Sequence, residues 1–177
     1  MTMHDTKIKL SDETERHTLT VLVDNEAGVL ARVVGLFSGR GYNIESLTVA
    51  EVDPMARTSR ITIVTSGTPD VIEQIEAQLR RLVPTHKVTN WTSADTGIER
   101  EMALVKVSGT GEKRVEALRM ADAFRARPVD TTHSSFVFEI TGSPHKIDSF
   151  VDLMRPLGLV DVSRTGVAAI SRGPEAM

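Results

Sequence analysis

The chain has 177 residues, of which 40% are hydrophobic and 25% are charged, and its formal net charge at pH 7 is −3. This length suits one ordinary domain or two small ones, and the slightly acidic balance gives no electrostatic reason to expect a nucleic acid as a partner. The absence of cysteine excludes disulfides, thiolate catalysis and cysteine-based metal sites.

The first 16 residues are mostly polar or charged, and they predict a disordered or extended leader. They lack the apolar central segment of a secretory signal peptide. No apolar run in the chain approaches the ~20 residues that a membrane-spanning helix needs. We therefore expect a cytoplasmic protein that does not associate with a membrane.

Residues 17–23 alternate apolar and polar side chains, which predicts a half-buried strand. A helix is predicted to follow and to end at Gly39–Gly41, because apolar side chains recur at helical spacing. These side chains are Val29, Leu30, Val33, Val34 and Phe37.

A polar turn that contains Asn25 and Gly28 joins this strand to this helix. Free backbone N–H groups and the positive end of the dipole favour an anion where a helix begins. Gly28 has no Cβ and would let a small carboxylate approach the backbone, while Asn25 offers a donor and an acceptor beside it. On pattern alone, a plain corner capped by Asp24 or Asn25 is the simpler interpretation.

The next elements complete a unit over residues 17–92. Strands are predicted at 43–52, 60–65 and 85–92, and a helix begins at Thr68-Pro69 and stops before Pro84. Its apolar stripe consists of Ile72, Ile75, Leu79 and Leu82. The order βαββαβ predicts a ferredoxin-like α+β fold, in which two helices cover one face of an antiparallel sheet.

A small, polar stretch at residues 93–99 is the predicted linker, and a second ferredoxin-like unit follows at 100–173, with a tail at 174–177. Its first helix, within 111–127, is expected to direct inward the side chains of Ala117, Leu118, Ala121 and Phe124. A strand begins at Pro128, where the missing N–H suits a sheet edge or a strand start. The second helix opens at Ser143-Pro144 and bears Ile147, Phe150, Val151 and Met154.

The two halves align as an internal repeat of fold, because residues 63–69 match residues 138–144. The turn with Asn25 and Gly28 has no counterpart in the second half, where residues 108–111 read Ser-Gly-Thr-Gly. We therefore expect one half to bind a ligand and the other half to serve another purpose.

No catalytic or metal-binding constellation is predicted. The Gly109-Thr110-Gly111 turn resembles the start of a dinucleotide fingerprint, but Arg114 stands where its third glycine would be, so a tight turn into a helix is the better interpretation. The histidines, including His133 and His145, form no i, i+4 pair and are interpreted as surface or strand residues. Arg32 and Arg40 are interpreted as a solvated helix face or, alternatively, as a contact with a partner.

Two sequence runs resemble a known family. Residues 24–33 (DNEAGVLARV) look like the ligand-binding turn of ACT domains, which are small βαββαβ modules that bind amino acids. Residues 34–49 (VGLFSGRGYNIESLTV) closely resemble the regulatory, or small, subunit of acetolactate synthase, also called acetohydroxyacid synthase. The resemblance continues through 59–64, 100–107 and 164–173, and it covers the chain from Glu15 to Gly173.

This resemblance implies a non-catalytic subunit that binds the large subunit of acetolactate synthase. The large subunit condenses two pyruvates, or pyruvate with 2-oxobutyrate, in branched-chain amino-acid synthesis. Thiamin diphosphate, Mg and FAD are expected in that catalytic partner, and no cofactor is expected in this chain. The small subunit raises the activity of the large subunit and confers feedback inhibition by valine, or in some cases by leucine or isoleucine.

In this family, two ACT domains pair side by side as a homodimer with an eight-stranded sheet, and the effector sites lie at the dimer interface. The motifs assign effector binding to Asn25, Gly28, Val29 and Leu30 of one chain, with Asn43, Ile44 and Ala50 contributed by the partner. Ala27 stands where many ACT turns have proline. The competing interpretation is a free-standing amino-acid-sensing ACT protein that regulates a different enzyme or transcription.

Overall fold

The computed structural model describes residues 13–94 and 96–177. The chain divides into two compact units, with the boundary between Thr96 and Gly97, inside the predicted linker. Both units are α+β, and each contains an antiparallel sheet of βαββαβ topology, as predicted. No helix among the described residues is long and apolar enough to span a membrane.

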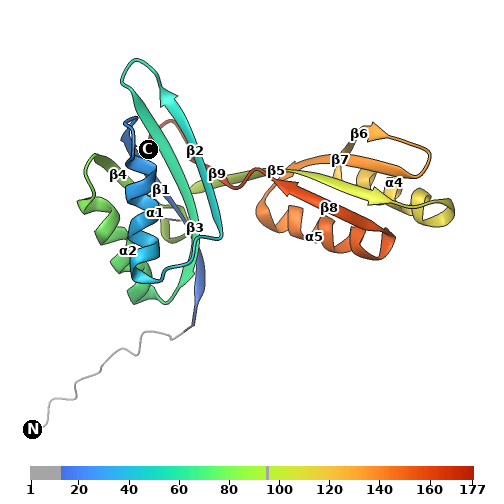
Figure 1. The fold of residues 1–177 in the computed structure, drawn as a ribbon, viewed down its shortest axis with the longest axis horizontal. Coiled ribbons are helices and arrows are strands. Elements are labelled where there is room, and N and C mark those ends of the chain that lie inside the picture. Colours follow the sequence, from blue (N-terminus) through green and yellow to red (C-terminus); the bar gives the residue numbers. More distant parts are fainter. Residues whose placement is uncertain (1–12, 95) are drawn as a thin grey trace, which may run out of the picture. The chain divides into compact units, whose positions relative to one another are not determined.

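The N-terminal unit has a four-stranded sheet in the order β2-β3-β1-β4, and α1 and α2 lie on one of its faces (Figure 1). The short helix α3 (Trp91–Ala94) comes directly after β4. Its Trp91 Nε1 donates a hydrogen bond to Thr20 Oγ1 of β1 over 2.7 Å. The main elements are β1 (Glu15–Asp24), α1 (Val29–Arg40), β2 (Ser46–Asp53), β3 (Thr58–Gly67), α2 (Pro69–Arg81) and β4 (Thr85–Asn90).

The core of this unit forms where the alternating side chains of β1 and β3 meet the apolar stripes of the two helices. The α2 stripe is confirmed, because Ile72, Ile75 and Leu79 are buried and Leu82 packs against them. The buried cluster consists of Leu19, Val21, Val23, Val29, Val33, Phe37, Ile61, Ile63, Ile72, Ile75 and Leu79.

Several predicted strand boundaries in this unit are wrong. Strand β2 starts at Ser46 instead of Asn43, and β3 spans Thr58–Gly67 instead of 60–65. Strand β1 starts at Glu15 instead of His17, because Glu15 and Arg16 pair with Gly67 and Ser66 of β3. Strand β4 ends at Asn90, because the chain turns into α3 at Trp91. The rest of the predicted leader, residues 1–12, lies outside the described residues.

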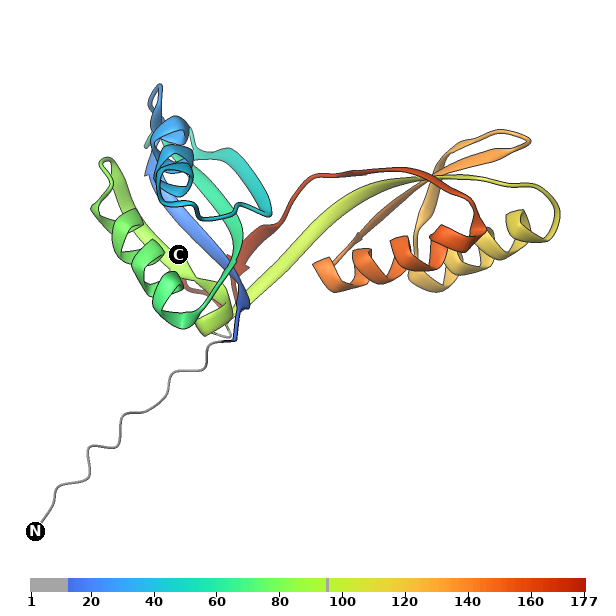
Figure 2. The same cartoon turned by 60° about the horizontal axis from the view of Figure 1, so that its bottom comes forward.

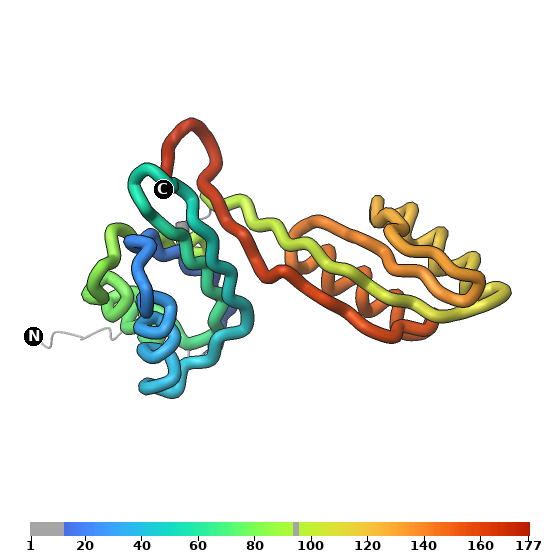
Figure 3. Tube along the Cα trace, turned by 45° about the horizontal axis from the view of Figure 1, so that its top comes forward, coloured from blue at the N-terminus to red at the C-terminus, as the bar shows by residue number. Residues whose placement is uncertain are grey.

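The C-terminal unit has strands in the order β6-β7-β5-β8, with α4 and α5 on one face (Figure 2). Strand β9 pairs with the beginning of β5, and the chain from β8 to β9 runs along β5 (Figure 3). Its elements are β5 (Gly97–Ser108), α4 (Gly111–Phe124), β6 (Arg127–Thr131), β7 (Ser135–Gly142), α5 (Pro144–Met154), η1 (Arg155–Leu157), β8 (Leu159–Arg164) and β9 (Ala168–Ser171).

Strand β5 begins at Gly97, before the predicted start of this unit at residue 100. Residues 97–100 pair with residues 168–171, and this long-range pairing extends β5 into the predicted linker. Strand β6 lies at the sheet edge, as expected for a strand that contains Pro128, and its register shifts between Pro128 and Asp130.

The core of the C-terminal unit is rich in phenylalanine. Phe138 stacks on Phe136 at 5.2 Å between ring centroids, and Phe150 packs against Phe138 at 6.2 Å and Phe124 at 5.4 Å. The α5 prediction is confirmed, because Ile147, Phe150, Val151 and Met154 are all buried.

The prediction that Leu118 points inward is wrong, because this side chain is 40% exposed. Ala117 and Ala121, one turn apart, occupy the buried side of α4, and Phe124 is partly buried against the core. Leu118 is rotated by about 100° from Ala117 on the helix, which places it toward solvent.

An ion-pair network fixes β8 in this unit. Arg164 binds the buried carboxylate of Glu101 on β5 through Nε and Nη2, at 2.8 and 2.6 Å, and its Nη1 reaches Asp148 of α5 at 2.6 Å. The hydrogen bonds that Arg164 donates to Glu101 raise the pKa of Arg164, so this guanidinium stays charged. One arginine therefore links two strands and a helix.

Candidate effector-binding site

The turn between β1 and α1 exposes the start of α1. Gly28 is the N-cap residue, with φ 86°, and no side chain in the described part of the chain caps the helix. This left-handed conformation favours glycine, and a Cβ at Gly28 would meet no atom within 4 Å. No described residue accepts a hydrogen bond from the backbone N–H groups of Ala27, Gly28 or Leu30. The turn therefore presents free donors beside open space.

Hydrogen bonds tie Asn25 to the end of β2 and to the loop that follows it. The backbone N–H of Asn25 donates to the carbonyl oxygen of Arg57 over 2.6 Å. The side-chain amide Nδ2 donates to Oε1 of Glu51 on β2 over 3.0 Å. Next to this residue, Asp24 Oδ1 lies 2.6 Å from Nε2 of His86. The polar side chains of the turn are therefore held from two sides.

A hollow of about 380 Å³ opens beside the turn, and it is lined by Asp24, Asn25, Glu26, Ala56 and Arg57. Three contributing residues from a later part of the chain were not predicted from the sequence: Ala56 and Arg57, which line the hollow, and Glu51, which bonds Asn25. A local signal for this loop existed in Asp53-Pro54, because Asp53 Oδ1 accepts the N–H groups of Met55 and Ala56 in a side-chain-stabilised turn.

The four effector-binding residues predicted in the β1–α1 turn and at the start of α1 do not all face the hollow. Asn25, Gly28 and Leu30 are exposed, whereas Val29 is only 3% exposed and packs in the core. Only the backbone of Val29 remains available to a ligand. An apolar contact from this group therefore has to come from Leu30, which is 41% exposed.

The residues predicted to come from the partner chain, Asn43, Ile44 and Ala50, do not belong to the β1–α1 turn. Asn43 and Ile44 precede β2, which begins at the end of the sheet where Ser46 pairs with Val64. Strand β2 then runs for eight residues, roughly 25 Å at strand spacing, before it reaches the end near Asp24. Ala50 is exposed within β2. A site that uses Asn25 and Asn43 together therefore needs a second copy of this unit.

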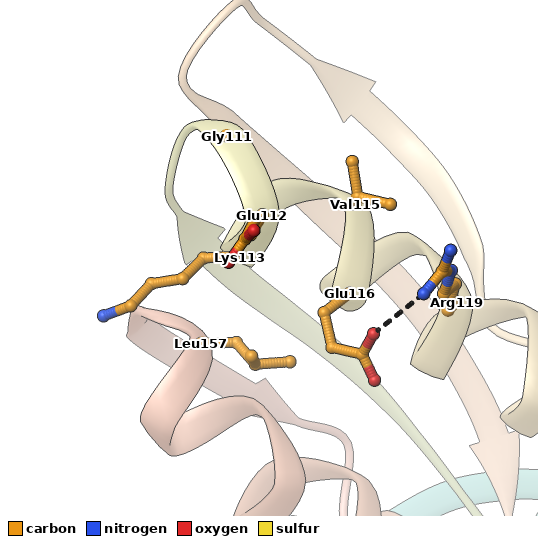
Figure 4. A pocket seen from close by; sticks show the side chains of 7 residues that line it. All are labelled: Gly111, Glu112, Lys113, Val115, Glu116, Arg119 and Leu157. Carbon is orange, nitrogen blue, oxygen red and sulfur yellow. Dashed lines mark ion pairs between the residues drawn. The ribbon is translucent and has the colours of Figure 1, made fainter.

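A larger hollow, of about 730 Å³, lies at the start of α4 in the C-terminal unit (Figure 4). Most of its lining comes from one face of α4, where Glu116 and Arg119 form an ion pair at 3.6 Å, and Lys113 points away from that pair (Figure 4). Its polar side chains do not converge on one point. The lining residues are Gly111, Glu112, Lys113, Val115, Glu116, Arg119 and Leu157.

The Gly109–Gly111 turn leads directly into α4, with Thr110 as the N-cap residue. Gly109 donates its backbone N–H to the carbonyl oxygen of Ser134 over 2.8 Å, so part of this turn is already bonded within the unit. Across the described residues, no group of three or more His, Asp or Glu side chains could hold a metal ion.

The chain matches two family models. The model described as "AHAS small subunit-like ACT domain" covers residues 19–87, and the one described as "Small subunit of acetolactate synthase" covers residues 100–173. The chain is 46% identical over 158 residues to a probable acetolactate synthase small subunit of Archaeoglobus fulgidus, which covers 89% of this chain and 98% of that protein.

Further relatives agree with these matches. The isozyme 3 small subunit of Escherichia coli acetolactate synthase is 44% identical over 163 residues, which cover 92% of this chain and 99% of that protein. The crystal structure of an acetolactate synthase small subunit from Thermotoga maritima superimposes with a TM-score of 0.78 at 35% identity, covering 91% of this chain and 99% of that chain.

Proposed function

The chain belongs to the family of acetolactate synthase small subunits, and we propose that it confers feedback inhibition by valine, or by another branched-chain amino acid, on a catalytic large subunit. That partner would use thiamin diphosphate, Mg and FAD, and the complex would work in the cytoplasm. The observation that carries the proposal is the uncapped start of α1, where free N–H groups face open space at Gly28.

Each part of an amino acid would find a matching group at this turn. The effector carboxylate would accept the N–H groups at the start of α1, where the helix dipole also favours negative charge. Its aliphatic side chain would contact Leu30, which is exposed, and Ile44 of a second copy. The acidic side chains around Asn25 would balance its ammonium group.

A homodimer through β2 would complete this site. Strand β2 is an edge strand, and Leu47 packs against the helix-side core, so Val49 and Glu51 share that face by alternation. Val49 is 43% exposed there, and Leu30 of α1 is 41% exposed. An antiparallel pairing of two β2 strands would cover this apolar surface. It would also bring the beginning of one β2, with Asn43, beside the end of the other.

An effector that contacts both chains can regulate the large subunit through the dimer. Binding would favour the arrangement of the two ACT domains in which both halves of the site are closest. Catalytic activity would fall if the large subunit is less active when bound to that arrangement, because a ligand shifts an equilibrium only toward the state it binds more tightly.

The test is to reconstitute the full-length chain with its large subunit and to titrate acetolactate synthesis with valine, leucine and isoleucine. We expect one of them to inhibit the wild-type complex. Gly28→Asp should abolish this inhibition while activation of the large subunit persists, because the new carboxylate would occupy the anion position.

Gly111→Asp is the matched control, since Gly111 lies at the start of α4 with φ 60° and equally open surroundings. It should retain both activation and inhibition. Inhibition that survives in Gly28→Asp would contradict the assignment of the site to this turn. A chain that binds valine but leaves the large subunit unaffected would instead favour the free-standing sensor.

A further inference from the structure

We propose that Glu51 and Asn25 together form the acceptor pair for the ammonium group of the amino-acid effector, with Glu51 also fixing the orientation of the Asn25 side chain. This inference rests on the proposed function, because it assigns the amine-recognising part of the same site. It adds Glu51, a residue of β2, to a site otherwise built from the β1–α1 turn.

The hydrogen bond between these two side chains determines which atom of Asn25 is free. Nδ2 of Asn25 lies 3.0 Å from Oε1 of Glu51. An ionised carboxylate can only accept hydrogen bonds, so the amide nitrogen has to face Glu51 and the carbonyl oxygen has to face away from it. The backbone N–H of Asn25 also donates to Arg57, which holds the residue from a second side. Asn25 therefore presents an oriented acceptor.

Glu51 retains an acceptor of its own. Its Oε1 is bonded to Asn25, and no described residue forms a hydrogen bond or ion pair with Oε2. Glu51 is exposed, so this oxygen is accessible to a ligand. An ammonium group carries three donors and could bond Oε2 and the Asn25 carbonyl oxygen together. Hydrogen bonds of this charged kind are about twice as strong as neutral ones.

The position of Glu51 relates this pair to the start of α1. Glu51 pairs with Ser59 of β3, and Ser59 pairs with Val23, whose side chain lies in the helix-side core. By alternation, Glu51 projects from the same face as Val23, toward the side of the sheet that carries α1. A zwitterion at the turn would thus meet N–H donors on the helix side and oxygen acceptors on the β2 side.

The surrounding charges also favour a ligand that carries an amine. Asp24, Glu26 and Glu51 lie in or beside the turn, with Arg57 as the arginine that lines the same hollow. Asp24 is engaged by His86, whereas Glu26 and Glu51 make no ion pair with a described residue. A simple anion would meet this acidic surface unfavourably, whereas an ammonium group next to the carboxylate of the ligand would offset it.

The experiment compares valine with 3-methylbutanoate, which is the same carbon skeleton without the amine. Full-length wild-type protein, Glu51→Gln and Glu73→Gln are titrated by calorimetry, and the thermal melting of each is measured with and without either ligand. Glutamine at position 51 can still accept from Asn25, so it removes the charge and leaves the turn in place. We expect Glu51→Gln to bind valine about tenfold more weakly, the loss expected for one charged hydrogen bond.

Glu73→Gln is the matched control, because it removes the same charge from an exposed glutamate of α2 that does not line the hollow, and it should bind valine within about twofold of wild type. 3-Methylbutanoate has no ammonium group, so the melting shift that it gives should not decrease in either variant. Equal valine affinity in wild type and Glu51→Gln, or an equal loss for Glu73→Gln, would overturn the inference. A wild-type chain that binds no branched-chain amino acid, alone or with its large subunit, would instead contradict the proposed function.

Discussion

The second strand of each unit lies at an edge of its sheet, yet the two edges are built differently. Strand β2 has eight residues and no proline, and its exposed residues include Val49 and Val52. Strand β6 has five residues, and Pro128 and a register shift interrupt it. Strand β2 shifts register only near its end, between Glu51 and Asp53, so its pairing is regular from Ser46 to Glu51. A short strand that contains proline protects an edge from association, whereas a longer regular stretch invites it. The same topology thus supplies one edge suited to pairing and one edge protected from it.

The turn before the first helix also differs between the two units. Both turns place a glycine with positive φ at the start of a helix, Gly28 in the N-terminal unit and Gly111 in the C-terminal unit. Asn25, with its bond to Glu51, has no equivalent beside Gly111. The fold therefore recurs in both units, but among the described residues a side-chain hydrogen bond like that of Asn25 and Glu51 occurs at one of the two turns only. Function has to be assigned from these local features and not from the topology they share.

The largest effect is expected from a core substitution that tests whether the two units unfold independently. Phe150→Ala removes a fully buried ring that contacts Phe124 and Phe138. It should destabilise the C-terminal unit by about 3–5 kcal/mol, through lost burial and the cavity left behind. Trp91 is the single tryptophan of the chain and lies in the N-terminal unit, so its fluorescence reports that unit alone.

We therefore expect denaturant unfolding followed by circular dichroism to show an early transition in Phe150→Ala, while the Trp91 transition stays where it was. Phe37→Ala, which removes the buried phenylalanine of the N-terminal core, should move the Trp91 transition instead. If the transitions followed by circular dichroism and by Trp91 fluorescence shift together in either variant, the two units unfold cooperatively and are not independent in stability.

Most of the architecture could be predicted from the sequence because it depends on local periodicity. The stripes of α2 and α5, and the helix starts at Pro69 and Pro144, follow from spacing and from proline geometry within one segment. The early start of β5 could not be predicted, because Gly97 enters the strand by pairing with Ser171, which lies 74 residues away. The exposure of Leu118 depends on which side of α4 packs on the sheet.

In the candidate site too, the residues of one short segment could be predicted from the sequence, and the residue that joins them from a distant strand could not. Asn25 and Gly28 stand in a short polar segment at a predicted helix start, and the resemblance to ACT domains pointed to the same segment. Glu51 could not be identified from sequence, because it joins the turn through a hydrogen bond across 26 residues and through the sheet register. The buried side chain of Val29 could not be foreseen either, since a stripe of apolar residues does not show which of its members face the core.

An intermediate effect is expected at the two edges. Val49→Lys places a charge on the open β2 edge, where a two-fold dimer would bring two copies of it close together. It should weaken dimerisation by about 1.5 kcal/mol, or roughly tenfold in Kd. Val129→Lys in β6 is the matched control, because Val129 is 49% exposed and Val49 is 43% exposed. Analytical ultracentrifugation would measure both, and an equal loss in both variants would remove the distinction between the two edges.

The smallest effect is expected at the second helix of each unit, where the two N-caps share a backbone conformation but differ in one hydrogen bond. Thr68 has φ −68° and ψ 159°, and Ser143 has φ −64° and ψ 155°, and a proline follows each of them. Ser143 Oγ accepts the N–H of Lys146 over 3.3 Å, whereas Thr68 makes no side-chain cap. Ser143→Ala should therefore cost about 1 kcal/mol.

Thr68→Ala removes no capping bond, so its cost should stay within about 0.5 kcal/mol, the usual range for a substitution that breaks no specific interaction. Urea unfolding resolves this difference when circular dichroism follows the C-terminal unit and Trp91 fluorescence follows the N-terminal unit. Equal costs for the two variants would mean that the capping bond of Ser143 contributes little, and that the shared Pro69 and Pro144 geometry alone starts both helices. A larger cost for Ser143→Ala would instead show that a single hydroxyl distinguishes two helix starts that share one backbone.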